Sequence, residues 1–258
     1  MTFMLDDRTA AGRELARVLS KYHNKPHVVV LALPRGGVPV AAEIARELHA
    51  PLDVMLVRKL GAPGNEELAM GAIATGGIRL VNAQVVAALR IDERVFEQVA
   101  AREQAELERR MKAYRGERPW PAIAGATVIL VDDGIAIGAT MRAAIAAVRA
   151  QRPERVVVAV PVAPFKLVVQ LRREADEVVC LASPEPFTAV ATYYRSFPQL
   201  TDRQVCDILR ERWTCEHRLE VIPGATRLFE EPGTRDAVAR LAREWFDRHV
   251  KTAVGLAA

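Results

Sequence analysis

Residues 128–141 read VILVDDGIAIGATM, and this stretch gives the strongest indication of the fold. The apolar run 128–131 is typical of a buried parallel strand, and residues 141–150 have the spacing of a helix. Asp132, Asp133 and the glycine-containing loop after them therefore lie at the carboxyl end of a strand. Open α/β sheets bind their ligands at that edge, so the stretch predicts a binding site together with a fold.

The polar groups of this stretch fit a sugar phosphate. Backbone N–H groups at the start of a helix point toward an anion, and the helix dipole favours negative charge there. The residues that would supply these groups are Ile137, Gly138, Ala139 and Thr140. Asp132 and Asp133 would each accept hydrogen bonds from the vicinal hydroxyls of a ribose. The stretch therefore predicts recognition of both ends of ribose 5-phosphate.

Strands and helices alternate on both sides of this stretch. Helices are expected over residues 7–22, where Asp7 is the cap, and over 38–49, 93–114, 164–175 and 201–212. Strands are expected over 28–33, 52–57, 155–160 and 177–182, and a hairpin over 69–75 and 78–81 with its turn at the Gly76-Gly77 pair. This alternation predicts an α/β fold, a parallel sheet with helices on both faces.

Two further loops carry groups suited to anions. Residues 33–40 read LPRGGVPV, in which Gly36 and Gly37 let backbone amides approach a ligand and Arg35 supplies a forked cation suited to a diphosphate. A plain strand-to-helix turn is the alternative, because Gly-Gly turns are common. Residues 58–67, RKLGAPGNEE, mix cations, glycines and acids, and a merely solvated loop is the alternative there.

The three loops together resemble those of the type I phosphoribosyltransferases, and the resemblance covers about residues 1–212. In that family the stretch 128–141 corresponds to the motif that binds phosphoribosyl pyrophosphate (PRPP). Residues 33–40 correspond to the pyrophosphate loop, with a cis peptide expected between Pro34 and Arg35, and residues 58–67 look like the mobile catalytic loop. The resemblance implies transfer of a phosphoribosyl group from PRPP to a nucleobase, release of pyrophosphate, and Mg²⁺ held mainly by PRPP itself.

The resemblance also assigns roles to single residues. Catalytic roles fall on Arg35, Lys59, Glu66, Asp132 and Asp133. Substrate-binding roles fall on Gly36, Gly37, Arg58, Asp132, Asp133, Ile137, Gly138, Ala139, Thr140 and Phe187. Phe187, Tyr193 and Tyr194 lie where relatives place a hood over the base, although a place in the core is equally expected for aromatic side chains.

Two positions depart from the family pattern. Ile137 stands where the motif usually has a hydroxyl residue, so one phosphate contact is missing and weaker phosphate binding is expected. Ala136 stands where many purine-specific relatives have an acid that protonates the base, which disfavours hypoxanthine or guanine as the acceptor. A non-catalytic module that senses PRPP or a nucleotide is therefore the alternative to an enzyme.

Composition excludes several other classes of protein. The 258 residues carry 36 basic and 32 acidic side chains, a balance that does not indicate nucleic acid, and no basic run supports that partner. No stretch approaches the roughly 20 apolar residues of a membrane span, so a cytoplasmic protein is expected. Cys180, Cys206 and Cys215 are widely spaced, which predicts neither a disulfide nor zinc.

Residues 213–258 form an expected C-terminal appendage of one strand and one helix. Residues 219–250 resemble the last strand and helix of a dienelactone hydrolase domain, with Arg227 where that domain has the histidine of its catalytic triad. Arginine stays protonated near neutral pH and cannot act as a general base, so hydrolase activity is not expected. Val238, Leu241, Trp245 and Phe246 would bury an apolar helix face on the core or in a homo-oligomer.

Overall fold

The computed structural model describes residues 3–213, 236–241 and 243. The chain divides into two compact units, Met1–Thr214 and Cys215–Ala258. In the second unit, residues 236–241 are helical, in agreement with the helix predicted there, and Val238 is 38% exposed rather than buried. The predicted strand at residues 219–222, Arg227, Trp245 and Phe246 lie outside the described residues.

The first unit is built on a five-stranded parallel sheet of order β2-β1-β6-β7-β8. Its strands are β1 (Val28–Ala32), β2 (Leu52–Val54), β6 (Thr127–Val131), β7 (Arg155–Val162) and β8 (Glu177–Ala182). The predicted α/β fold with a parallel sheet is therefore confirmed. The strands read as nearly continuous apolar runs because both faces of the sheet are covered.

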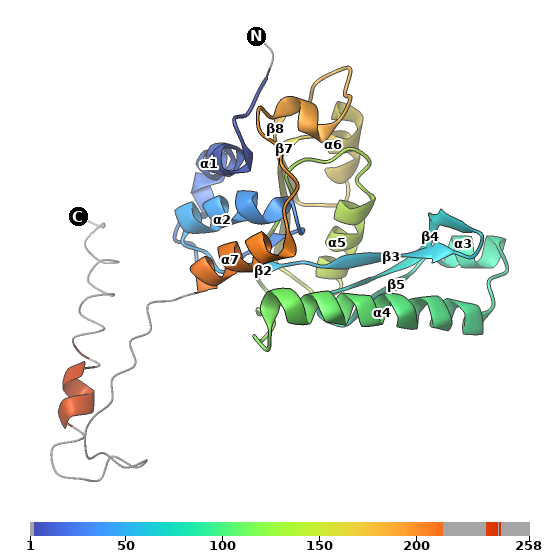
Figure 1. Ribbon diagram of the computed structural model, residues 1–258, viewed down its shortest axis with the longest axis horizontal. Coiled ribbons are helices and arrows are strands. Elements are labelled where there is room, and N and C mark those ends of the chain that lie inside the picture. The colour runs from blue at the N-terminus through green and yellow to red at the C-terminus, as the bar shows by residue number, and fades with distance from the viewer. Residues whose placement is uncertain (1–2, 214–235, 242, 244–258) are drawn as a thin grey trace. The chain divides into compact units, whose positions relative to one another are not determined.

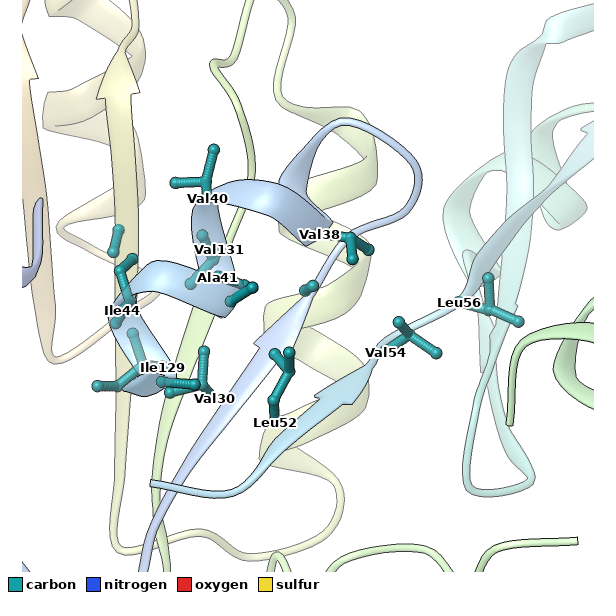
Figure 2. Close-up of a cluster of buried hydrophobic side chains, with 14 of the residues drawn as sticks. Val30, Val38, Val40, Ala41, Ile44, Leu52, Val54, Leu56, Ile129 and Val131 are labelled. Atoms are coloured by element: carbon teal, nitrogen blue, oxygen red, sulfur yellow. The ribbon is translucent and has the colours of Figure 1, made fainter. Parts of the chain in front are cut away.

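Helices cover both faces of this sheet (Figure 1). On one face lie α1 (Arg8–Val18) and α2 (Gly37–Leu48), and on the other lie α5 (Ala139–Arg149) and α6 (Phe165–Leu171). Successive strand residues point to opposite faces. Val30 and Ile129 therefore pack against α2, as Figure 2 shows, whereas Leu130 belongs to the cluster beneath α5 and α6.

A second, antiparallel sheet of order β3-β4-β5 comes after β2 in the chain; its β4–β5 hairpin was predicted from the sequence, whereas its strand β3 was not. Its strands are β3 (Val57–Ala62), β4 (Asn65–Ala74) and β5 (Ile78–Val81). Residues 58–67 were expected to be a loop, but they form the β3–β4 hairpin. Leu60 and Ala62 are buried, and only Pro63 and Gly64 make the turn. The predicted turn at Gly76-Gly77 lies between β4 and β5.

The remaining elements pack against these two sheets. They are the helices α3 (Ala83–Ala88), α4 (Glu93–Arg115) and α7 (Asp202–Trp213), and the 3₁₀ turns η1 (Ser20–Tyr22) and η2 (Val190–Tyr193). α4 runs alongside the antiparallel sheet (Figure 1), and its buried residues belong to the same hydrophobic cluster as Leu60 and Met70. The caps predicted at Asp7 and at Thr201 with Gln204 are confirmed by hydrogen bonds of 2.7 to 3.2 Å. In the described part of the chain, no helix has the length and apolar character needed to span a bilayer.

Candidate functional site

The candidate site lies where the strand order of the parallel sheet reverses. From β1 the chain passes to β2 on one side, and later enters β6 on the other side of β1. β1 and β6 pair in parallel with Ala32 opposite Val131, so the loops after these strands leave the sheet at one point. Ligands of open α/β sheets bind at such a switch point. The loops that begin there are the two glycine-containing loops singled out from the sequence.

The two loops touch each other. The N–H of Leu33 donates to the carbonyl of Val131 at 2.8 Å. A Cβ atom at Gly36 would lie 2.0 Å from Oδ2 of Asp133, and one at Gly37 would lie 2.5 Å from the Val131 carbonyl oxygen. The close approach of the backbones therefore requires glycine at position 37, and a side chain at position 36 would displace the carboxylate of Asp133. The peptide between Pro34 and Arg35 is cis, as expected from the resemblance.

The acid pair is enclosed by protein on several sides. Oδ1 of Asp132 accepts the backbone N–H of Asp133 at 2.9 Å, and Oδ2 of Asp133 accepts from Nε of Arg8 at 2.7 Å. Burial raises the pKa of Asp132, and the neighbouring charge of Asp133 raises it further. Burial also raises the pKa of Asp133, but hydrogen bonding to Arg8 opposes this rise. Arg8 thus supplies the compensating charge for Asp133.

The loop after the acid pair leads into α5 as predicted. Gly138 precedes the helix with a φ of 86°, and Ala139 begins it. The first backbone N–H groups of a helix have no partner within it and are free to bind an anion. Ala139 and Thr140 are exposed at this position, and the side chain of Ile137 projects into solvent with 85% of its surface exposed.

Arg35 stands at the mouth of the same site. Its side chain is half exposed, and Nη1 lies 3.8 Å from Oδ1 of Asp202 at the start of α7. A pair this long and this exposed contributes little to stability. The guanidinium is therefore able to exchange Asp202 for an anionic ligand without a large cost.

The hairpin residues occupy a different place from the acid pair. Arg58 donates to Glu103 of α4 at 2.8 Å. Lys59 and Glu66 line a hollow of about 450 Å³ together with residues of the first half of α4. The structure thus brings Arg35, Gly36, Gly37, Asp132 and Asp133 together, and it places Arg58, Lys59 and Glu66 on the β3–β4 hairpin.

The aromatic residues of the predicted hood divide into two groups. Phe187 is partly exposed, and its ring centroid lies 5.5 Å from that of Tyr193. Tyr193 and Tyr194 are 7% and 6% exposed, so for these two the alternative of core aromatics holds. The hydroxyl of Tyr194 donates to the carbonyl of Asp133 at 2.6 Å. Sequence reasoning missed both this contact and that of Arg8, because no local pattern links residues so far apart.

Comparison with known proteins agrees with this geometry. A family model described as the phosphoribosyl transferase domain matches residues 3–194, which is most of the chain and includes both loops. This chain belongs to that family. The resemblance found in the sequence is therefore confirmed for the family, and the end of the matched region coincides with Tyr194 beside the acid pair.

Two relatives are similar to this chain over most of its length. A protein of Mycobacterium tuberculosis, found in strains CDC 1551 / Oshkosh and ATCC 25618 / H37Rv and named as an inferred phosphoribosyl transferase, is 44% identical over 233 residues. These residues are 90% of this chain and 52% of the relative, so the chain spans about half the length of the curated relatives it matches. A crystal structure of a protein from Thermus thermophilus shares 46% identity and a TM-score of 0.73, over 81% of this chain and 98% of that one.

Proposed function

We propose that the protein transfers the phosphoribosyl group of PRPP to a nucleobase or related acceptor and releases pyrophosphate. The observation that carries this proposal is the contact between the two loops at the switch point, where Gly36 lies against Asp133. The contact puts a loop suited to a diphosphate beside a pair of acids suited to ribose hydroxyls. Family membership supports the same reaction class.

Each part of PRPP has a matching part of the site in this proposal. The 5′-phosphate binds the backbone N–H groups at residues 137–140, where α5 begins. The ribose hydroxyls donate to Asp132 and Asp133. The pyrophosphate binds the amides at Gly36 and Gly37, and the fork of Arg35 neutralises its charge as the bond to the anomeric carbon breaks.

The chemistry of the site also fits Mg²⁺. Magnesium keeps several waters and binds phosphate oxygens of the substrate in such sites, and the loop assigned to pyrophosphate lies beside the acid pair. We assign the ion mainly to pyrophosphate and ribose oxygens of PRPP, with no side chain of the chain as its ligand. Bound there, it would supply positive charge where negative charge develops on the leaving group.

The β3–β4 hairpin is proposed to close over bound PRPP. Its tip carries a Pro63-Gly64 turn in which Gly64 has a φ of 75°, and its residues include the cations Arg58 and Lys59 and the acid Glu66. Closure would exclude water from a cation-like transition state and bring Lys59 to the leaving group. Phe187, partly exposed beyond β8, is the proposed contact for the acceptor base.

Product analysis tests the reaction directly. The protein is incubated with PRPP, Mg²⁺ and a panel of adenine, uracil, orotate, hypoxanthine and guanine, and nucleotides and pyrophosphate are detected by mass spectrometry. We expect a nucleotide product with at least one base other than hypoxanthine and guanine, because Ala136 offers no acid to those purines. The matched control is Asp132→Asn combined with Asp133→Asn, which should form no product.

The exposed Ile137 favours a second candidate function. A side chain that is 85% exposed where the family usually has a hydroxyl contributes no hydrogen bond to a phosphate. A module that binds PRPP or a nucleotide without turning it over would tolerate that loss. Calorimetry of PRPP binding beside the product analysis distinguishes the two functions, because binding without pyrophosphate release with any base supports the module and contradicts the enzyme.

We further propose that residues 1–212 form the transferase domain and residues 213–258 an appendage derived from a hydrolase. The division into units at Thr214 supports the boundary. Arg227 in place of a triad histidine supports an appendage without hydrolase activity.

A further inference from the structure

Three segments that are far apart in the sequence meet at Asp133. Arg8, the first residue of α1, is only 8% exposed, and its Nε donates to Oδ2 of Asp133 at 2.7 Å. Tyr194 donates its hydroxyl to the carbonyl of the same aspartate at 2.6 Å. The side chain and the backbone of Asp133 are therefore held from two directions by residues outside its own loop.

The guanidinium of Arg8 is itself fixed in place. Its Nη1 donates to the carbonyl of Pro198 at 2.7 Å, and its Cζ lies 3.7 Å from the centroid of the Phe197 ring. A guanidinium that stacks on an aromatic ring while it donates to a carbonyl has little freedom to turn. Its third contact, with the carboxylate of Asp133, is thus presented in a fixed direction.

The backbone around this cluster is also tied together. The N–H of Leu5 donates to the carbonyl of Tyr193 at 2.9 Å, and the N–H of Arg195 donates to the carbonyl of Leu5 at 2.8 Å. These two bonds hold the segment before α1 against the segment after η2. The position of Arg8 is therefore fixed by segments other than the loop after β6.

A purely structural role does not explain an arginine at this position. A buried ion pair contributes little more to stability than apolar side chains of similar volume would. Without Arg8, two desolvated carboxylates would share the site, and the one nearest Gly36 would face an incoming diphosphate with no compensating charge. The site therefore requires the positive charge of Arg8 at this position beside Asp133.

We propose that Arg8 is a positioning residue of the phosphoribosyl site: it holds the carboxylate of Asp133 toward Gly36 and compensates the charge of that carboxylate, so that a diphosphate can bind beside it. This inference rests on the proposed function, since it assigns Arg8 to the binding of the same substrate. Arg8 itself touches no reacting atom and acts only through Asp133.

The first test needs no substrate. The carboxyl of Asp133 is titrated by carbon NMR in the wild type, Arg8→Met and Arg8→Lys, with Asp132 and Tyr194 as the other titratable groups around it. Loss of the arginine partner should raise the pKa of Asp133, and lysine should restore only part of the effect, because it keeps the charge but loses the fork. Equal titration in the wild type and Arg8→Met would overturn the proposal.

The second test measures PRPP affinity with Mg²⁺ by calorimetry in a double-mutant cycle. Arg8→Met should weaken binding about tenfold or more in the wild-type background, and much less when Asp133→Asn is already present. Arg13→Met is the matched control, because Arg13 lies on the same helix in an exposed pair with Glu43 and should leave affinity unchanged. An equal loss in both backgrounds would show that Arg8 does not act through Asp133.

The outcomes for the two proposals are separable. A wild-type protein that binds no PRPP contradicts the proposed function, while the NMR titration still decides whether Arg8 controls Asp133. If Arg8→Met does not fold by circular dichroism, Arg8→Lys carries both tests, because it keeps the charge but loses the fork. Wild-type affinity and wild-type titration in Arg8→Lys would then show that the geometry of the arginine is not needed.

Discussion

At the residue scale, the site is governed by charges that are partly removed from water. Asp132 and Asp133 lie side by side, Arg8 compensates one of them, and burial favours their protonated forms. A ribose with two hydroxyl donors would restore hydrogen bonds that these carboxylates lack from solvent. Single substitutions here should therefore change ligand affinity more than they change the fold.

Asp132→Asn combined with Asp133→Asn should weaken PRPP binding. Each hydrogen bond to a charged group is worth about 1.5 to 3 kcal/mol, so the loss of affinity should be at least about tenfold. Calorimetry measures the affinity, and thermal denaturation verifies that the double mutant is folded. Unchanged affinity in a folded double mutant would remove the acid pair from the proposed site.

Ile137→Thr should tighten the binding of PRPP or of a nucleotide 5′-phosphate. The substitution restores the hydroxyl that is usual in the family, and it buries nothing new because the isoleucine is 85% exposed. A change in the free energy of unfolding within about 0.5 kcal/mol is expected, as for other exposed positions. If titration calorimetry finds equal or lower affinity, then Ile137 does more than remove one hydrogen bond to the phosphate.

At the scale of elements, the end of α4 is fixed to the parallel sheet by a buried ion pair. Arg115 donates to both carboxylate oxygens of Asp53 in β2, at 2.6 and 2.8 Å, and to the carbonyl of Pro119 at 2.8 Å. Both side chains are almost fully buried. The pair therefore joins the helix that supports the hairpin to the sheet that supports the site.

Asp53→Asn should destabilise the protein by about 3 to 5 kcal/mol, because it leaves the buried guanidinium of Arg115 without its counter-charge. Urea denaturation followed by circular dichroism measures the change. Glu97→Gln is the matched control, since it breaks an exposed pair with Arg79 and should cost much less stability. Similar losses of stability for the two variants would show that burial does not make the Arg115–Asp53 pair more important than an exposed pair.

The β3–β4 hairpin should lose mobility when substrate binds. Residues near the Pro63-Gly64 turn are exposed, whereas Leu60 and Ala62 are buried against the rest of the unit. Hydrogen exchange at residues 63–68 should slow on addition of PRPP with Mg²⁺ and stay unchanged with Mg²⁺ alone. Equal exchange in both samples would show that the hairpin does not close over the ligand.

At the scale of the whole molecule, both glycine-containing loops and the residues that hold them belong to the unit Met1–Thr214. The apolar positions of residues 219–250 have helical spacing, and an isolated strand and helix cannot bury such a face alone. The appendage is therefore expected to serve stability or assembly rather than chemistry.

Deleting residues 217–258 should lower the melting temperature or change the oligomeric state while PRPP affinity stays the same. Burial of one large apolar side chain is worth roughly 1.5 to 3 kcal/mol, which a melting curve detects. Sedimentation reports the assembly, and an ester substrate should show no hydrolysis before or after deletion. Unchanged melting and sedimentation, or ester hydrolysis abolished by Arg227→Ala, would contradict a structural appendage.

The parallel sheet, its flanking helices and the two loops at its carboxyl edge could be predicted from the amino-acid sequence. Apolar runs such as 128–131, and caps such as Asp7, are local signals, because periodicity and capping involve residues a few positions apart. At residues 58–67 these local signals led to the wrong prediction of a loop. Glycine, proline and charge there mark a turn, but they do not show that the flanking residues pair as β3 and β4.

Only the tertiary structure decided how the acid pair is held. Arg8 and Asp133 are 125 residues apart, and Tyr194 and Asp133 are 61 apart. At such separations no periodicity or spacing links the partners, since their contact depends on how α1, the loop after β6 and the segment after η2 pack together. The local sequence thus specifies which groups line the candidate site, and the packing of distant segments sets the surroundings and direction of Asp133.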